Sequence, residues 1–257
     1  MSLRVFAHGG GVQSTAALVL SAQGEIDFPV HLFSNVGDDS EHPATLKYVR
    51  EVSMPYAEAH GVELREVHRI RRNGERDTLL GQLHRAKRSI DIPVRMADTG
   101  SPGNRKCTQV FKLDVLRKCG ADVLGIGFTV DEIHRVGRVH GPQVREFPLV
   151  DLGLRRSDCH TVIESAGLPV PPKSACYFCP FKRPQQFAEM RRDEPQLFDK
   201  AADLEDLLNE RREMLGKDRV YLTRFGRPLR ECIGPAQETL FDQSPDIDTC
   251  DEGVCFV

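Results

Sequence analysis

The chain begins with a short apolar run, three consecutive glycines and a helix-forming segment, and this order constrains the fold more than any other feature. Arg4 to Ala7 is predicted to be a buried strand, the glycines a turn, and Ser14 to Ala22 a helix. Glycines let backbone N–H groups approach phosphate oxygens, and the N-terminus of a helix is a positive dipole end. The hydroxyls of Ser14 and Thr15 add donors there. The segment therefore predicts an anion-binding turn, with an ordinary tight turn as the alternative.

Strand and helix patterns continue to alternate after this segment. Such alternation is typical of an α/β fold in which helices cover both faces of a parallel, twisted sheet. Arg69 to Arg105 has weak periodicity and is expected to be a long loop with a short helix near Thr78 to His84. Further strands are predicted at 30–34, 63–67 and 122–128, a short extended piece at 147–149, and helices at 44–60, 107–118, 157–166, 184–192 and 195–215. From residue 224 the chain is expected to be irregular.

Composition bounds the class of protein. The 257 residues are 40% hydrophobic, enough for one large domain with a smaller appendage, and the formal net charge is -3. This balance does not mark the whole chain as a nucleic-acid binder. The basic residues between Arg65 and Arg88 form either a solvated face or a phosphate-contacting surface. With no secretory signal pattern and no apolar segment of about 20 residues, a cytoplasmic protein without a membrane span is expected.

Eight cysteines are many for a chain of this size, and a reducing compartment disfavours structural disulfides. Cys176 and Cys179 form a C-x-x-C followed by proline, a spacing at which two thiolates bind one metal centre. Together with Cys107 and Cys159 upstream, they suggest a site of four thiolates. Both zinc and [4Fe–4S] clusters accept such a set, and a redox pair is the alternative.

The other four cysteines are interpreted differently. Cys119 and Cys232 have no partner at ligand spacing and are expected to be small buried apolar residues. Cys250 and Cys255 frame four residues near the end of the chain. A mobile tail with two thiols would deliver a persulfide, or reduce an intermediate by forming a disulfide. Incidental thiols in a disordered tail are the alternative.

The glycine segment resembles the S-G-G-x-D-S loop of the PP-loop ATP pyrophosphatases, which split ATP between its α and β phosphates. It lacks the lysine of G-x-x-x-x-G-K-[ST] and the spacing of G-x-G-x-x-G. Gly10, Gly11 and Ser14 match the pyrophosphatase loop, while Gly9 stands in place of Ser and Gln13 in place of Asp. The resemblance implies that ATP, with Mg²⁺, is bound by Gly9, Gly10, Gly11, Gln13, Ser14 and Thr15.

Two further segments resemble the phosphoadenosine phosphosulfate (PAPS) reductase-like branch of that superfamily. Phe33 to Thr45 is similar to its D-T-G-x-x-x-P-E-T element, and Gly125 to Arg135 to its G-x-R-x-x-E-S-x-x-R element. The resemblance implies that the backbone near Phe33 to Asn35 holds adenine, and that Gly37 and Gly127 also bind the nucleotide. It further implies that Asp131 and Arg135 lie near the nucleotide or substrate as catalytic residues. An exposed ion pair at a helix start is their alternative.

The cysteine arrangement looks like that of the DndC and SspD family of DNA phosphorothioation proteins, over most of residues 3–190. This likeness implies a [4Fe–4S] cluster on Cys107, Cys159, Cys176 and Cys179, with Zn²⁺ as the alternative. Without Cys159, three cysteines would leave an open iron that takes up a sulfur atom. A nucleotide-binding α/β domain is expected over 1–150, and a cluster-binding, helical or irregular region packed on it over 151–257.

The reaction implied is transfer of AMP from ATP to an oxygen, followed by replacement of that oxygen by sulfur. DNA is favoured over tRNA as the substrate. The expected partners are a cysteine desulfurase as sulfur donor and other proteins of the modification system, and an oligomer is compatible with this. Three other functions stay open: tRNA thiolation, sulfonucleotide reduction and a non-catalytic nucleotide sensor. The absence of the E-C-G-x-H sequence argues against sulfonucleotide reduction.

Overall fold

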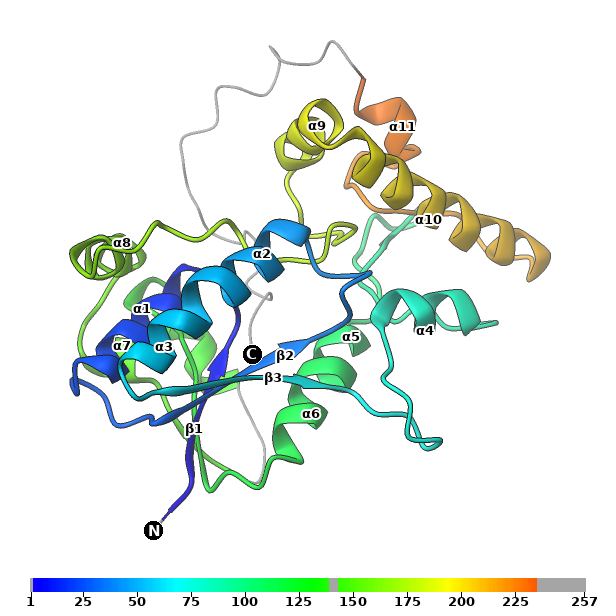
Figure 1. Ribbon diagram of the computed structural model, residues 1–257. Helices are drawn as coiled ribbons and strands as arrows, with labels where there is room; N and C mark the ends of the chain where they lie inside the picture. The colour runs from blue at the N-terminus through cyan, green and yellow to red at the C-terminus, as the bar shows by residue number, and fades with distance from the viewer. Residues whose placement is uncertain (1, 139–142, 235–257) are drawn as a thin grey trace. The chain divides into compact units, whose positions relative to one another are not determined.

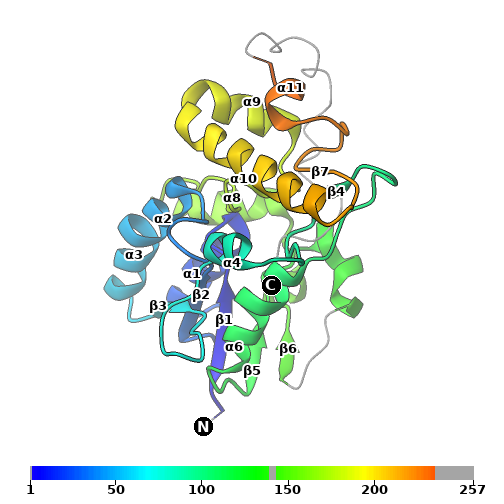
Figure 2. The ribbon, with the colours of Figure 1, turned by 90° about the vertical axis from the view of Figure 1, so that its right-hand side faces the viewer.

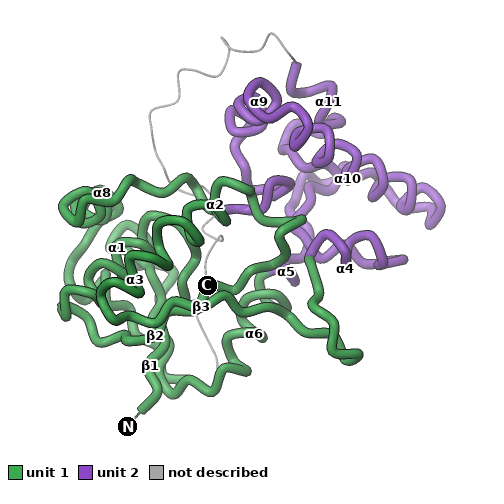
Figure 3. The backbone as a smooth tube through the Cα atoms, in the orientation of Figure 1, with its two compact units in different colours: residues 1–78, 108–174, 256–257 green, residues 79–107, 175–255 purple. Residues whose placement is uncertain are grey.

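The computed structural model describes residues 2–138 and 143–234, which form two compact units (Figure 3). Unit 1 contains 2–78, 108–138 and 143–174, and unit 2 contains 79–107 and 175–234. The sequence predicted one division near residue 150. The described chain divides differently, because residues 79–107 leave unit 1 between two of its elements and belong with the C-terminal helices.

Unit 1 is built on a five-stranded parallel sheet with the order β3-β2-β1-β5-β6 (Figures 1 and 2). Its strands are β1 Arg4–His8, β2 Val30–Asn35, β3 Glu63–His68, β5 Val123–Gly125 and β6 Val144–Glu146. All six residues of β2 are buried, as expected for a central strand of a parallel sheet that is covered on both faces. The predicted α/β class with a parallel sheet is confirmed.

Alternate side chains of β1 pack against helices on opposite faces of this sheet. Phe6 lies in one apolar cluster with Ala16 of α1 (Val12–Ala22) and Ile163 of α8 (Arg156–Ser165). Val5 packs in another cluster with Leu116 of α6 (Asp114–Arg117). In Figure 1, α1 and α8 accordingly lie to the left of β1, and α6 lies to its right. Helices therefore cover both faces, as predicted.

Two helices predicted to be continuous contain a π-helical turn. The first runs through α2 (Pro43–Tyr48), η1 (Val49–Ser53) and α3 (Met54–Ala59), and the second through α5 (Lys106–Thr108), η2 (Gln109–Leu113) and α6. In η2 the carbonyl of Phe111 accepts a hydrogen bond from the Ser34 hydroxyl at 2.6 Å. Because π turns interrupt the regular i→i−4 bonding, such carbonyls can turn to outside donors. The contact ties η2 to the end of β2.

Unit 2 is mainly helical. Its helices are α4 Leu79–Arg85, α9 Pro184–Asp193, α10 Pro195–Met214 and α11 Leu229–Cys232, and β4 Arg95–Met96 pairs antiparallel with β7 Val220–Tyr221. The Arg211 guanidinium of α10 donates hydrogen bonds to the carbonyls of Leu83, His84 and Ala86, which closes the C-terminal end of α4. None of the helices in the described ranges is long and apolar enough to cross a membrane.

A buried carboxylate organises the C-terminal half of unit 2. Glu205 of α10 is 2% exposed, and its two oxygens accept hydrogen bonds from the backbone N–H groups of Leu222 at 2.6 Å and Leu229 at 2.7 Å. These bonds hold the segment after β7 and the start of α11 against α10. Burial raises the pKa of Glu205 to about 7, although the two backbone donors act in the opposite direction.

We expect Glu205→Gln to destabilise the protein by about 2 kcal/mol, because the amide N–H₂ would face a backbone N–H and leave it without an acceptor. In the wild type, the folded state retains a proton on Glu205 between pH 4.5 and about 7 that the unfolded state has released. Its contribution to stability therefore falls as pH rises through this window. Urea unfolding at several pH values should show this slope in the wild type and not in the variant. The exposed Glu210 of the same helix provides the control, and a Glu210→Gln variant with the same loss would contradict the assignment.

Candidate functional site

The strand order reverses at β1, because β2 and β3 lie on one side of it and β5 and β6 on the other. In open parallel sheets, ligands bind outside the carboxyl ends of the strands at such a reversal. Two predicted site segments leave the sheet there: the glycine turn after β1, and the segment after β5 that leads into the 3₁₀ helix η3 (Val130–Arg138). A Cβ on Gly127 would lie 3.6 Å from the Cβ of Gln13, so the two segments are in contact.

The glycine turn allows no side chain at its centre. Gly10 has a φ of 71°, in the left-handed region that glycine adopts without strain. A Cβ at this position would lie 3.0 Å from Thr45, 3.1 Å from Val49 and 3.3 Å from Phe33. The backbone of the turn is therefore held against β2 and the helical run that follows it. Phe33 itself is a core residue at 1% exposure, so its ring is not available to a ligand.

The start of α1 is buried, and Ser14 orders it. The Gly11 N–H donates to the Ser14 hydroxyl at 3.1 Å, and this hydroxyl donates back to the Gly11 carbonyl at 3.0 Å, so Ser14 orders the turn. Thr15 is fully buried beside Tyr48, which leaves its hydroxyl in the core. The first turn of α1 contains no acidic residue. Backbone amides, rather than the Thr15 hydroxyl, are thus the groups suited to an anion.

Gln13 joins the glycine turn to both later segments. Its side-chain carbonyl accepts from Arg156 at 3.1 Å, and its amide group donates to Glu132 at 3.3 Å. Glu132 is also paired with Arg135, whose guanidinium lies 4.3 Å from the centre of the Phe128 ring. Because Arg156 is the first residue of α8, the N-termini of α1 and α8 both lie at Gln13.

Asp131 and Arg135, predicted together, have different surroundings. Asp131 accepts from the backbone N–H of Arg156 at 2.8 Å and lies 3.8 Å from the Arg155 guanidinium, so it stabilises the start of α8. Arg135 is 5% exposed and is not the exposed ion pair considered as its alternative. Its buried pair with Glu132 is therefore the charged group of η3 that is held in a fixed place near the turn.

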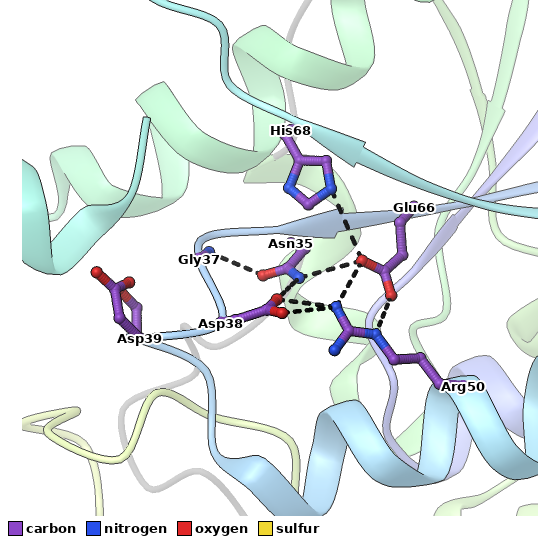
Figure 4. Close-up of polar contacts among 8 residues, drawn as sticks. Asn35, Gly37, Asp38, Asp39, Arg50, Glu66 and His68 are labelled. Atoms are coloured by element: carbon purple, nitrogen blue, oxygen red, sulfur yellow. Dashed lines mark hydrogen bonds and ion pairs between the residues drawn. The ribbon is translucent and has the colours of Figure 1, made fainter. Parts of the chain in front are cut away.

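The end of β2 is locked by a polar network, shown in Figure 4. The Asn35 amide donates to Asp38 at 2.7 Å and to Glu66 at 3.2 Å, and its carbonyl accepts from the Gly37 N–H at 2.8 Å. Arg50 binds both carboxylates, at 2.8 Å to Asp38 and 2.6 Å to Glu66. The hydrogen bond from Arg50 lowers the pKa of Asp38. The Asn35 side chain is therefore fully engaged within the protein.

β2 extends beyond the end of its pairing with β1, and its last residues, Ser34 and Asn35, are buried at 6% and 0% exposure. The pairing between β1 and β2 ends at His8 and Phe33, whereas β3 continues beside β2 as far as Asn35 and His68. Peptide groups of Ser34 and Asn35 thus extend past β1, next to the glycine turn. A planar base with donor and acceptor edges can pair with such groups, which favours the predicted adenine position.

His8 is a feature that sequence reasoning missed. It precedes the glycine turn and is 3% exposed, and neither of its ring nitrogens has a hydrogen-bond partner among the described residues. Burial lowers its pKa to about 3, so the ring is neutral. The Thr129 hydroxyl, at 0% exposure before η3, also lacks a partner. The His8 ring lies in the core beside the rings of His31 and Phe33, whose centres are 5.8 Å and 6.5 Å away.

Cys159 lies in the core of unit 1. It is 0% exposed among apolar side chains that include Phe6, Ala17 and Ile163. Burial, followed by the nearby charge of Asp158, raises the pKa of its thiol to about 12. The thiolate form that a metal requires is therefore disfavoured. These surroundings are those of a small apolar core residue and do not support Cys159 as a ligand.

The other three predicted ligands, Cys107, Cys176 and Cys179, belong to unit 2. The Arg105 guanidinium lies 5.1 Å from the centre of the Phe181 ring, which brings the segment of Cys107 beside the C-x-x-C turn. Within residues 2–138 and 143–234, however, no three His, Cys, Asp or Glu side chains converge as ligands of one metal ion. Cys250 and Cys255 lie outside the described residues.

Sequence reasoning also missed Arg156 as a site residue. Its signal was present, because two consecutive arginines precede a predicted helix at 157–166. Only the fold shows that the first residue of this helix, Arg156, contacts Gln13.

Comparison with known proteins finds no relative. No protein-family model matches the chain, and neither a curated protein nor a solved structure does.

Proposed function

We propose that the chain is an ATP pyrophosphatase that transfers AMP to an oxygen of a nucleic acid, so that sulfur can replace this oxygen. One observation carries the proposal. The glycine turn, the end of β2 and the buried Glu132–Arg135 pair lie near the point where the strand order reverses, which supports a nucleotide site there. The resemblance of the glycine turn to the PP-loop sequence pattern supports ATP as the nucleotide.

We propose that different groups of the site bind the phosphates and the adenine of ATP. Backbone amides from Gly9 to Gly11 and the N-terminus of α1 bind the β and γ phosphates, while the backbone of Ser34 and Asn35 holds adenine. The acceptor oxygen then attacks the α phosphorus, and the bond from this phosphorus to the bridging oxygen breaks. Pyrophosphate leaves with the electron pair, and the fixed amides stabilise its charge. Arg135, held by Glu132, faces the adenylated product.

Sulfur insertion completes the proposed reaction. A sulfur nucleophile attacks the adenylated centre, forms the bond to sulfur and expels AMP with the activated oxygen. We propose DNA as the acceptor, a cysteine desulfurase as the sulfur source, other proteins of the modification system as partners and the cytoplasm as the location. Cys107, Cys176 and Cys179 are proposed to hold a [4Fe–4S] cluster or Zn²⁺, because they share one unit and the Arg105–Phe181 contact joins their segments. As described, they do not converge on one ion, and none of the steps above depends on it.

We expect the purified protein, with its partner proteins and DNA, to convert ATP to AMP and pyrophosphate, and not to ADP. Chromatography of the nucleotides and mass spectrometry of digested DNA give the two readouts. Phosphorothioate linkages in the DNA support the proposed acceptor. A thiolated nucleoside in tRNA with unmodified DNA would assign tRNA instead, and sulfite released from an adenylylated sulfate would assign a reductase. If the protein binds ATP but does not convert it in the presence of the partners, the result would assign a non-catalytic nucleotide sensor.

A further inference from the structure

The loop residue that is Asp in the PP-loop pattern is Gln13 here, and its contacts define what it can do. Its amide oxygen accepts from Arg156 at 3.1 Å and its amide nitrogen donates to Glu132 at 3.3 Å. At 6% exposure the side chain is buried between these two partners. The amide is therefore fixed in orientation, with its oxygen toward a guanidinium.

The described residues do not fit a Mg²⁺ ion held by the protein at this turn. Mg²⁺ prefers carboxylate and water oxygens in near-octahedral geometry. Glu132, the carboxylate in contact with Gln13, is already paired with Arg135, and Asp131 accepts from the start of α8. Within the described ranges, no three His, Cys, Asp or Glu side chains converge as ligands of one metal ion. Mg²⁺ bound to ATP in solution would therefore find no carboxylate anchor here.

Arg156 brings positive charge to the same place. It is the first residue of α8, a helix of 10 residues, and it reaches Gln13 near the start of α1, a helix of 11 residues. The backbone N–H groups of Arg155 and Arg156 donate to Asp158 and Asp131, so the Arg156 guanidinium is the positive group that α8 brings to Gln13 beside the glycine turn.

We propose that Arg156, oriented by Gln13, binds the departing pyrophosphate and replaces a protein-anchored metal as the cation of this site. This inference rests on the proposed function, since it assigns the β and γ phosphates to the turn. The planar guanidinium can bind two phosphate oxygens at once, which Lys cannot do. Arg156 then neutralises part of the negative charge of the pyrophosphate, a role that a Mg²⁺ ion held by a protein carboxylate would otherwise have.

The test is calorimetric titration of inorganic pyrophosphate into the full-length protein, once with EDTA and once with Mg²⁺. We expect the wild type to bind pyrophosphate in both. Arg156→Gln should bind it about tenfold more weakly or worse, as expected for the loss of a hydrogen bond to a charged group. Arg156→Lys should fall between the two. Gln13→Leu, which keeps the guanidinium but removes its orienting oxygen, should also weaken binding. Arg155→Gln is the matched control, since it removes the same charge from an exposed neighbour, and it should bind like the wild type.

Each alternative outcome has a consequence. If Arg156→Gln binds pyrophosphate as tightly as the wild type, or if the wild type needs Mg²⁺ to bind it, the inference is overturned while the proposed function stands. A protein that binds ATP but not pyrophosphate overturns it equally. A wild type that binds neither ligand removes the proposed function as well. Circular dichroism of every variant separates lost binding from lost folding, and Gln13→Leu keeps the test valid if Arg156→Gln does not fold.

Discussion

Gly10→Ala is expected to weaken ATP binding about tenfold, or by about 1.4 kcal/mol, because the turn or its neighbours must shift by a few tenths of an ångström. The added methyl would lie 3.0 to 3.3 Å from three side chains behind the turn, in a backbone with φ of 71°. The turn can relieve this contact only by moving outward, toward the place where the phosphates would bind. Left-handed strain and overpacking should also lower the free energy of unfolding by about 2 kcal/mol. Calorimetric ATP titration and urea unfolding measure the two effects.

Gly24→Ala separates the effect on the site from backbone strain. Gly24 has a φ of 76°, close to that of Gly10, but a Cβ there would meet nothing within 4 Å. This control should lose about 1 kcal/mol of stability through left-handed strain and bind ATP like the wild type. If Gly10→Ala also binds ATP like the wild type, the glycine turn does not hold the phosphates, and the proposed function loses its main support.

The sheet and most helices were predictable because their signals are local. Apolar runs bounded by glycine or proline marked β1, β2 and β3, and the predicted ends of these strands lie within one residue of those in the structure. The C-terminal helices α9 and α10 were placed equally well from their starting prolines. The extended piece predicted at 147–149 is wrong: the strand β6 ends at Glu146, and Pro148 begins the helix α7 (Pro148–Asp151). A proline at the first helical position, which favours that helix, was the missed signal.

What could not be predicted depends on contacts between distant residues. The pair of β4 with β7 joins segments more than a hundred residues apart, and each strand has two residues, too few for any periodicity. The division into units follows from such contacts as well, since residues 79–107 belong with the C-terminal helices. The burial of Cys159 could not be predicted either, because it depends on the packing of α8 against α1 in the folded unit.

The site was predictable in its segments but not in its roles. The glycine turn, the end of β2 and the segment after β5 were each named from sequence, and the fold brings the first and last into contact. Sequence reasoning assigned Thr15 a hydroxyl role, whereas an inward-facing position on α1 buries it. It did not assign Arg156, because nothing in a pair of arginines shows which one will meet Gln13. Motif spacing thus named the segments of the candidate site, and packing decided which of their side chains contact one another.

Serine substitutions of the cysteines are expected to give the largest contrast in this protein. Cys176→Ser should abolish bound iron, the broad absorption of the anaerobically purified protein and phosphorothioate in the DNA of cells that depend on the variant. Cys159→Ser should retain all three and instead lower the free energy of unfolding by about 2 kcal/mol, because it places a hydroxyl in an apolar core. Iron analysis, visible spectra and urea unfolding distinguish these results without an activity assay.

Cys119→Ser serves as the matched control for the thiol itself. Cys119 is half-buried, and its Sγ lies 3.5 Å from the Val115 carbonyl, a contact that a hydroxyl can retain. The variant should keep both iron and stability. If Cys159→Ser loses iron as completely as Cys176→Ser, the thiol leaves the core in the metal-bound protein and the four-cysteine set predicted from sequence is restored. If a colourless protein with bound zinc is isolated instead, the three thiols of unit 2 hold a structural ion, and the sulfur must come from a partner or from the C-terminal cysteines.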